Sequence, residues 1–301
     1  MSAPTASALK PLRGVRVLTL ALNLPGPAAV MRLRALGAQC TKLEPPAPHG
    51  HSTADPMGLY KPAAYDAMHA GVRQVRADLK TAKGQAVLER ELAKADVLIT
   101  SFRASALRKL GLDWPTLHAR HPELCMVSIV GARGARADEP GHDLTYLAEN
   151  DLVTGLDLPA TLYADMGGSL LTTEAVLSAL LRRASAAGQG QGVFQEIALS
   201  DAAGYLALPR QWGLTTPDGA VGGAHAGYRI YPCKNGRVAL AALEPHFAQR
   251  LCEAAGLRAG SAQKMHTRST REAIAAFLLS QTRAQLDKLA READIPLHTL
   301  R

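Results

Sequence analysis

Residues 14–44 read GVRVLTLALNLPGPAAVMRLRALGAQCTKLE, and this stretch decides the fold. The apolar, β-branched run at residues 14–20 predicts a strand. Pro25, Gly26 and Pro27 then open a helical pattern that ends at Gly37, and residues 39–44 predict a second strand. Strand, helix and strand within about 30 residues form a βαβ unit, which predicts a parallel sheet covered by helices. The first turn also leaves backbone N–H groups near a helix start, where an anion can bind.

The same alternation continues along the chain. Residues 45–62 are rich in Pro, His and Gly, which predicts a long loop, and loops of this length often carry function. The sequence GQGQG at residues 188–192 is expected to end a helix, since it precedes a strand and does not fit the dinucleotide fingerprint. Further strands are expected at residues 74–79, 96–100, 124–130 and 193–199, and helices at residues 81–95 and 165–187.

A second domain is expected after a glycine-rich stretch at residues 215–227. Two apolar runs flank Asn235-Gly236, the dipeptide most typical of a two-residue hairpin turn, and helical patterns follow to the C-terminus. The sequence therefore predicts an α/β protein. Its large domain is Rossmann-like with a parallel sheet, at residues 1–218, and a smaller α+β domain occupies residues 219–301.

The composition is that of a globular protein. The 301 residues are 47% hydrophobic and 20% charged, which excludes a disordered chain and a collagen. The four cysteines lie far apart without a CxxC pair, so a disulfide framework and a zinc cage are both disfavoured. No run of about 18 apolar residues is present, and the N-terminus lacks the apolar stretch of a secretory signal. We expect a cytoplasmic protein without membrane contact.

The net charge of +8 is compatible with three kinds of partner: nucleic acid, an acidic membrane surface, or a phosphorylated small molecule. The basic residues are spread singly, and aromatic residues make up only 4% of the chain, too few to stack along a strand of nucleic acid. We therefore expect no nucleic-acid partner. His49 with His51 and His118 with His121 are possible metal ligands, but each pair lacks a nearby third ligand, so no metal site is predicted.

Two short segments are candidates for chemistry. The first is Gly141-His142-Asp143-Leu144-Thr145-Tyr146, and the second, Leu162 to Gly168, reads LYADMGG. In the second, Asp165 stands at the start of a helix and two glycines follow, which lets a ligand approach the backbone. Local sequence alone favours plainer roles, a helix N-cap for Asp165 and a satisfied loop histidine for His142.

The motifs together resemble the class III CoA-transferase superfamily over nearly the whole chain, and most closely its α-methylacyl-CoA racemase branch. The motifs that carry the likeness are Pro11 to Leu18 (PLRGVRVL), Pro25-Gly26-Pro27, Leu36-Gly37-Ala38, Lys42-Leu43-Glu44-Pro45-Pro46, Ala77-Asp78-Leu79-Lys80, Ala95 to Ile99 (ADVLI) with Phe102-Arg103, Leu110-Gly111-Leu112, Gly141-His142-Asp143, Asp165 with Gly167-Gly168, and Gly190-Gln191-Gly192.

The resemblance implies an interlocked homodimer acting on acyl-CoA, and it distinguishes two chemistries. In the transferases the position of Asp165 is a nucleophile that forms an acyl anhydride. In the racemases it exchanges a proton with the α-carbon of a 2-methylacyl-CoA, and the His of the GHD motif, here His142, acts on the opposite face. Transferases typically carry Tyr at that position. The Leu243-Glu244-Pro245-His246-Phe247 segment also resembles the racemase branch, where the matching Glu, here Glu244, hydrogen-bonds that His.

The same resemblance suggests how coenzyme A is held, as part of the substrate and without a tightly bound cofactor. The oxyanion of the enolate would meet backbone N–H groups around residues 165–168. The contacts implied for coenzyme A are Arg73 and Arg103 with phosphates, Ala77, Asp78, Leu79 and Lys80 with the adenine nucleotide, and Gly141, Asp143 and Tyr146 with the pantetheine and thioester region.

Three departures from the family pattern keep alternatives open. Positions often basic in the family are Ala70 and Val72, and the connection from His142 to Asp165 is shorter than in racemases. Family chains also continue past the position of Arg301 with a return segment. The sequence therefore predicts an acyl-CoA racemase, with a CoA-transferase and a CoA-binding relative without turnover as the alternatives.

Overall fold

The computed structural model describes residues 9–257 and 262–301, which form two compact units, the first ending at Ala207 and the second spanning Leu208–Arg301. The sequence analysis began the second domain at residue 219, which lies within the glycine-rich stretch of residues 215–227. In the structure the short helix α10 (Leu208–Gln211) already belongs to the second unit. The two units are described separately below.

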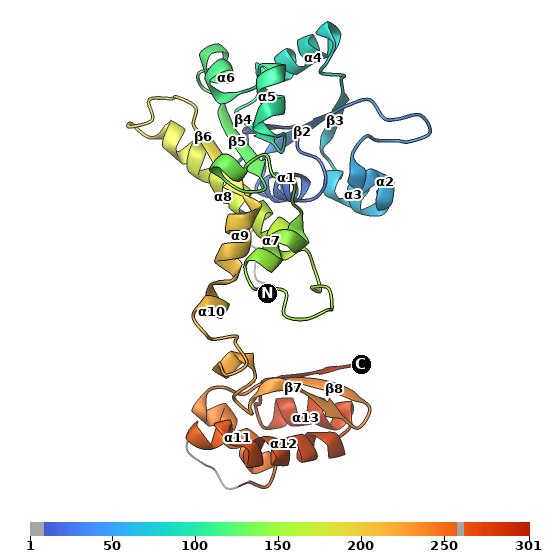
Figure 1. Ribbon diagram of the computed structural model, residues 1–301, viewed down its shortest axis with the longest axis vertical. Helices are drawn as coiled ribbons and strands as arrows, with labels where there is room; N and C mark the ends of the chain where they lie inside the picture. Colours follow the sequence, from blue (N-terminus) through green and yellow to red (C-terminus); the bar gives the residue numbers. More distant parts are fainter. Residues whose placement is uncertain (1–8, 258–261) are drawn as a thin grey trace, which may run out of the picture. The chain divides into compact units, whose positions relative to one another are not determined.

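The first unit is built on a six-stranded parallel sheet in the order β3-β2-β1-β4-β5-β6 (Figure 1). This order reverses between β1 and β4, which is the topology of a Rossmann-like fold. The predicted α/β class is confirmed. The strands are β1 (Arg16–Thr19), β2 (Gln39–Glu44), β3 (Arg73–Arg76), β4 (Val97–Thr100), β5 (Cys125–Val130) and β6 (Phe194–Ala198).

Helices cover both faces of this sheet, so each face has its own apolar core. On one face, Val30 and Leu33 of α1 and Val176 of α8 pack with Val17 and Ile99 of the strands. On the other, leucines of α4, α5 and α6 pack with Leu18, Leu98 and Met126. The helices of the unit are α1 (Pro25–Ala35), α2 (Pro56–Tyr60), α3 (Pro62–His69), α4 (Ala82–Leu92), α5 (Ala104–Leu110), α6 (Trp114–Arg120), α7 (Asp143–Glu149), α8 (Tyr163–Ala184) and α9 (Leu199–Leu206), with a 3-10 turn η1 (Gly134–Arg136).

Two helix starts differ from the sequence prediction. The long loop expected at residues 45–62 contains α2, because the Asp55 carboxylate accepts a hydrogen bond from the Met57 N–H at 2.9 Å and caps this helix. The helix α8 begins at Tyr163 after the N-cap Leu162, so Asp165 lies in its first turn. The plain interpretation of Asp165 as an N-cap is therefore wrong, and its carboxylate is free of that role.

The second unit combines a three-stranded antiparallel sheet with α-helices that follow it in the chain or lie between its strands. The hairpin predicted around Asn235-Gly236 is present, with Cys233 opposite Gly236 in the register. The sequence missed the strand β9, which pairs antiparallel with β8 and returns after α13. The elements are η2 (Ala220–Gly222), β7 (Tyr228–Cys233), β8 (Gly236–Ala241), α11 (Pro245–Ala254), η3 (Ala262–His266), α12 (Arg268–Ser280), α13 (Arg283–Glu292) and β9 (Leu297–Leu300).

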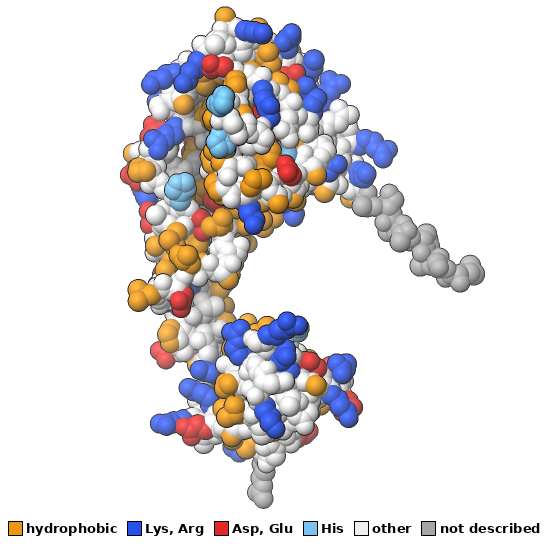
Figure 2. Space-filling model, turned by 90° about the vertical axis from the view of Figure 1, so that its right-hand side faces the viewer, with side chains coloured by type: hydrophobic (Ala, Val, Ile, Leu, Met, Phe, Trp, Pro, Cys, Tyr) orange, Lys and Arg blue, Asp and Glu red, His pale blue; other side chains and the backbone are white. Residues whose placement is uncertain are grey.

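The distribution of charge on the surface and the lengths of the helices are relevant to the nucleic-acid and membrane partners considered in the sequence analysis. On the face drawn in Figure 2, Lys and Arg side chains are distributed over both units with acidic side chains between them. Among the described residues, none of the helices is long and apolar enough to span a bilayer. The cysteines Cys40, Cys125, Cys233 and Cys252 are all buried thiols.

Candidate active site

A cavity of about 210 Å³ opens in the first unit at the carboxyl ends of β1, β4 and β5. The strand order reverses between β1 and β4, and in open parallel sheets ligands bind outside the carboxyl ends of the strands at such a reversal. The residues that line it are Leu22, Asn23, Pro25, Ser101, Phe102, Arg103, Ile129, Val130, Gly131, Ala137, Glu139, Gly141, His142, Tyr146, Asp165 and Leu199. Topology alone therefore makes this the candidate site.

Asp165 is a half-buried carboxyl in the first turn of α8. Burial, together with the charge of Asp143, raises its pKa to about 6, while His142 acts in the opposite direction. Among the described residues, none donates a hydrogen bond to this carboxylate. A carboxyl in this state changes protonation near neutral pH, as a group that both gives and takes a proton must.

His142 lies at the N-cap of α7 and is held through its backbone. Its N–H donates to Thr145 Oγ1 at 3.1 Å, and the Thr145 hydroxyl donates back to the His142 carbonyl at 2.8 Å. The main chain is thus fixed while the imidazole stays exposed and lines the same cavity as Asp165. Both side chains line this cavity, and the charge of His142 lowers the pKa of Asp165.

The backbone N–H groups expected to stabilise an oxyanion around residues 165–168 are already engaged at the start of α8. The Asp165 N–H donates to Asp143 Oδ1 at 2.9 Å, and the Met166 N–H donates to the Leu162 carbonyl at 3.0 Å. Asp143 is buried, so its role in the structure is to hold the first turn of the helix. These two N–H groups have no capacity left for a substrate oxygen.

Two glycines make room for the aromatic wall of the cavity. A Cβ added at Gly131 or Gly141 would collide with the buried Tyr146 side chain. The pKa of Tyr146 is raised by its burial and then by the charge of Asp165, and both residues line the cavity. Gly141 and Tyr146 line the cavity, and so does Arg103 at the N-cap of α5. Their predicted contacts with coenzyme A stay predictions.

Comparison with known proteins now decides the family, because residues 12–301 match CoA-transferase family III. The chain belongs to CoA-transferase family III. It is 30% identical over 273 residues to a succinate–glutarate CoA-transferase of Agrobacterium fabrum, covering 83% of this chain and 67% of that protein. It is also 30% identical over 262 residues to an alpha-methylacyl-CoA racemase of Mus musculus, covering 82% of this chain and 65% of that protein.

A solved structure of a related protein has the same fold as this chain. A CAIB/BAIF family protein from Brucella suis superimposes with a TM-score of 0.78 at 25% identity, covering 97% of this chain and 84% of that one. The chain spans about two thirds of the length of the two curated relatives described above. The family likeness thus includes both a transferase and a racemase.

The structure does not bring every predicted CoA contact to the cavity. Arg73 lies at the amino end of β3, where its guanidinium pairs with Glu91, so it faces the opposite edge of the sheet. Ala77 to Lys80 follow β3 at the carboxyl edge, but β3 is the outermost strand and the cavity is at β1, β4 and β5. Ala77 is buried in the core, and Asp78 accepts a hydrogen bond from the Lys80 N–H at 3.0 Å.

Glu244 belongs to the second unit, where it is the exposed N-cap of α11. Its predicted hydrogen bond to His142 stays a prediction.

The sequence analysis missed two residues of this site, Asn23 and Tyr60. Asn23 lines the cavity, and Tyr60 donates a hydrogen bond to Asn23 Oδ1 at 2.8 Å. The pKa of Tyr60 is raised by burial, then by Asp55 and by Asp165. Asn23 stands directly before the Leu24-Pro25-Gly26-Pro27 helix start, and a polar side chain in an otherwise apolar strand-to-helix turn was the available signal.

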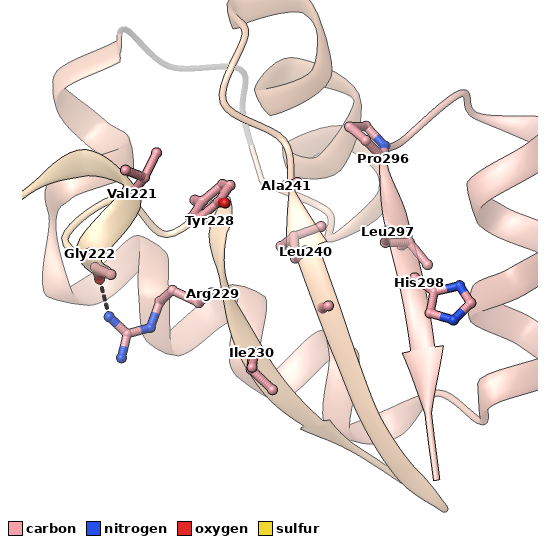
Figure 3. Close-up of a pocket in the computed structure, with 12 residues that line it drawn as sticks. Val221, Gly222, Tyr228, Arg229, Ile230, Leu240, Ala241, Pro296, Leu297 and His298 are labelled. Carbon is pink, nitrogen blue, oxygen red and sulfur yellow. Dashed lines mark hydrogen bonds between the residues drawn. The ribbon is translucent and has the colours of Figure 1, made fainter. Parts of the chain in front are cut away.

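A larger cavity of about 840 Å³ lies within the second unit, on the open face of its sheet (Figure 3). Apolar side chains such as Ile230, Leu240 and Leu297 line it, and Arg229 is held there by a hydrogen bond to the Gly223 carbonyl. Its lining contains Tyr228 and His298 but no carboxyl group, so we assign the chemistry to the smaller cavity, which His142 and Asp165 both line. No cluster of three metal ligands occurs in residues 9–257 and 262–301.

Proposed function

We propose that this protein racemises or epimerises 2-methylacyl-CoA thioesters by moving the α-proton from one face of the carbon to the other. The observation that carries the proposal is the shared cavity of His142 and Asp165, with the pKa of Asp165 raised to about 6. A residue at each side of one carbon is the minimum that an inversion by proton transfer requires.

The reaction needs only acid–base chemistry. The α-C–H bond breaks, its proton passes to a neutral His142 or an ionised Asp165, and the electron pair forms the enolate of the thioester. A protonated Asp165 or the imidazolium of His142 then delivers a proton to the opposite face, and the thioester is regenerated with inverted configuration. Burial supports the protonated carboxyl that one direction of turnover needs.

The other features of the cavity agree with a thioester substrate. Arg103 at its rim supplies a positive charge for a phosphate group of coenzyme A. Coenzyme A enters as part of the substrate, so the proposal requires no tightly bound cofactor. Following the family resemblance, we propose a homodimer. The apolar side chains Leu170 and Leu181 on α8 are exposed in the single chain, and a second copy that covered this face of the helix would bury them.

Hydrogen exchange in deuterated water tests the proposal. Each enantiomer of 2-methylbutanoyl-CoA is incubated with the protein, and mass spectrometry and chiral chromatography follow α-deuterium incorporation and loss of enantiomeric purity. We expect both signals with the wild-type chain, and neither signal with His142→Ala or Asp165→Asn at the same protein concentration. A wild-type chain that binds the thioester but incorporates no deuterium contradicts the proposal.

CoA transfer is the second candidate, because a relative 30% identical to this chain is named a CoA-transferase. In that reaction the Asp165 carboxylate attacks the thioester carbonyl, the C–S bond breaks, and an aspartyl anhydride and the CoA thiolate form. Hydroxylamine distinguishes the two, since it converts the anhydride into a hydroxamate on Asp165 that peptide mass spectrometry detects. A hydroxamate without α-deuteration identifies the transferase.

A further inference from the structure

Asn23 has a strained backbone at the edge of the candidate site. Its φ is +65°, in the left-handed region that residues other than glycine rarely adopt. It follows β1 at the strand reversal and lines the same cavity as Asp165. Backbone strain of this kind persists only where the surrounding structure holds it, and it is concentrated at functional sites.

A buried ion pair holds this strained turn in place. Asp55 Oδ1 accepts the Asn23 N–H at 3.0 Å, and Asp55 Oδ2 pairs with the Lys42 ammonium. The side chains of Lys42 and Asp55 are both completely buried. Lys42 also donates to His69 Nε2 at 3.0 Å, while His69 Nδ1 donates to the Tyr65 carbonyl at 2.7 Å. The acceptor for Asn23 is therefore fixed by a network with little freedom to move.

The side chain of Asn23 is also oriented. The Tyr60 hydroxyl donates to its carbonyl oxygen Oδ1, which leaves the two N–H bonds of Nδ2 as the free polar end. Within the described ranges, Nδ2 has no hydrogen-bond partner in the protein. A half-buried carboxamide, fixed at its backbone and at its oxygen, thus offers an unused donor beside a cavity that contains Asp165.

The two backbone N–H groups at the start of α8 do not supply the donor that the proposed reaction needs. An enolate oxygen in a site of low dielectric requires preorganised N–H groups, and the Asp165 and Met166 N–H groups already bond to the protein. We propose that Asn23 Nδ2 donates a hydrogen bond to the thioester oxygen of the bound acyl-CoA and stabilises the charge that develops there. Tyr60 and Asp55 act as positioning residues for Asn23. This inference rests on the proposed function for its substrate class.

The first test measures the hydrogen bond itself. Infrared difference spectra are recorded with 2-methylbutanoyl-CoA carrying ¹³C at the thioester carbonyl, bound to the full chain. We expect the carbonyl band of the wild-type complex to lie at lower frequency than in Asn23→Gly and Asn23→Asp. Glycine tolerates the left-handed backbone, and aspartate keeps the acceptor for Tyr60, yet neither offers an amide donor. Equal band positions in all three complexes overturn the proposal.

The second test measures turnover. Removing one oxyanion donor lowers kcat by about 10²-fold or more in known cases, and we expect such a loss in Asn23→Gly with little change in KM. Tyr60→Phe is expected to lower kcat by about three- to tenfold, the effect of one hydrogen bond, and to have no further effect when Asn23 is already glycine. Additive losses, or a change confined to KM, contradict the positioning role of Tyr60.

The outcomes separate this inference from the proposed function. A band shift that depends on Asn23, without α-deuteration, supports the donor and rejects racemisation. Normal α-deuteration by Asn23→Gly with an unshifted band rejects the donor and leaves racemisation standing. A wild-type chain that binds no 2-methylbutanoyl-CoA rejects both. Circular dichroism of each variant shows that the fold is retained.

Discussion

Two aspartates at the carboxyl edge of the same sheet, Asp55 and Asp165, have opposite surroundings. Asp55 is completely buried, pairs with Lys42 and accepts two backbone N–H groups. Asp165 is half-buried, has Asp143 as its neighbour of like charge, and has a raised pKa. The comparison teaches that burial with partners makes a carboxylate structural, whereas burial without them makes it reactive.

The largest effect expected from this contrast is on turnover. Asp165→Asn keeps the size of the side chain but removes the group that gives and takes the proton, so we expect α-deuteration to fall by about 10³-fold, within the range for acid–base groups. The exposed Asp157→Asn is the matched control and should behave as wild type. An Asp165→Asn variant with more than a tenth of wild-type activity would show that Asp165 is not the acid or base.

Asp55→Asn should instead act on stability. The substitution leaves the ammonium of Lys42 buried without its closest counter-charge, which costs about 3–5 kcal/mol in comparable buried pairs. Urea denaturation followed by circular dichroism measures the change. The control is Glu272→Gln, which breaks an exposed ion pair with Arg268 and should cost less than about 0.5 kcal/mol. If the two variants lose similar stability, Asp55 is not the structural member of the comparison.

A smaller loss of stability is expected where Gly131 makes room for the Tyr146 side chain at the cavity. Gly131→Ala places a Cβ against the Tyr146 hydroxyl, so we expect a loss of about 2 kcal/mol, as for other overpacked sites. Tyr146→Phe removes that hydroxyl and should recover part of the loss in the double variant. Thermal unfolding of the four proteins in this double-mutant cycle measures the coupling. Strictly additive changes would show that the two residues do not meet.

The smallest effect concerns pH. Because the pKa of Asp165 is raised in the folded state, its contribution to stability is fully present below pH 3.8 and is lost as pH rises through about 6. Asp165→Asn lacks that titration, so it should be more stable than wild type at pH 8, by about 1 kcal/mol once solvent screening of the half-buried carboxyl is allowed for, and show no such advantage at pH 4. Urea denaturation at both pH values checks the sign. A larger advantage at pH 4 than at pH 8 would contradict the raised pKa.

The sequence predicted most of the first unit from its periodicity. The β-branched runs predicted six strands within a few residues of β1 to β6, and the family motifs indicated His142 and Asp165, which share the cavity. The sequence pattern predicted less where a strand depends on pairing with a segment far away in the chain. The sequence missed β9, a half-exposed strand of four residues whose pairing with β8 depends on a return of the chain after α13.

What the sequence determined by itself, then, is the class of fold and the family, because strand and helix periods and motif order are local properties of the chain. Only the tertiary structure decided which polar groups are used and which are free. It showed that Arg73 lies at the amino edge of the sheet, away from the cavity, that the Asp165 N–H is taken by Asp143, and that Asn23 has an unused donor. These are facts of hydrogen-bond satisfaction between residues far apart in sequence, and a linear pattern does not record them.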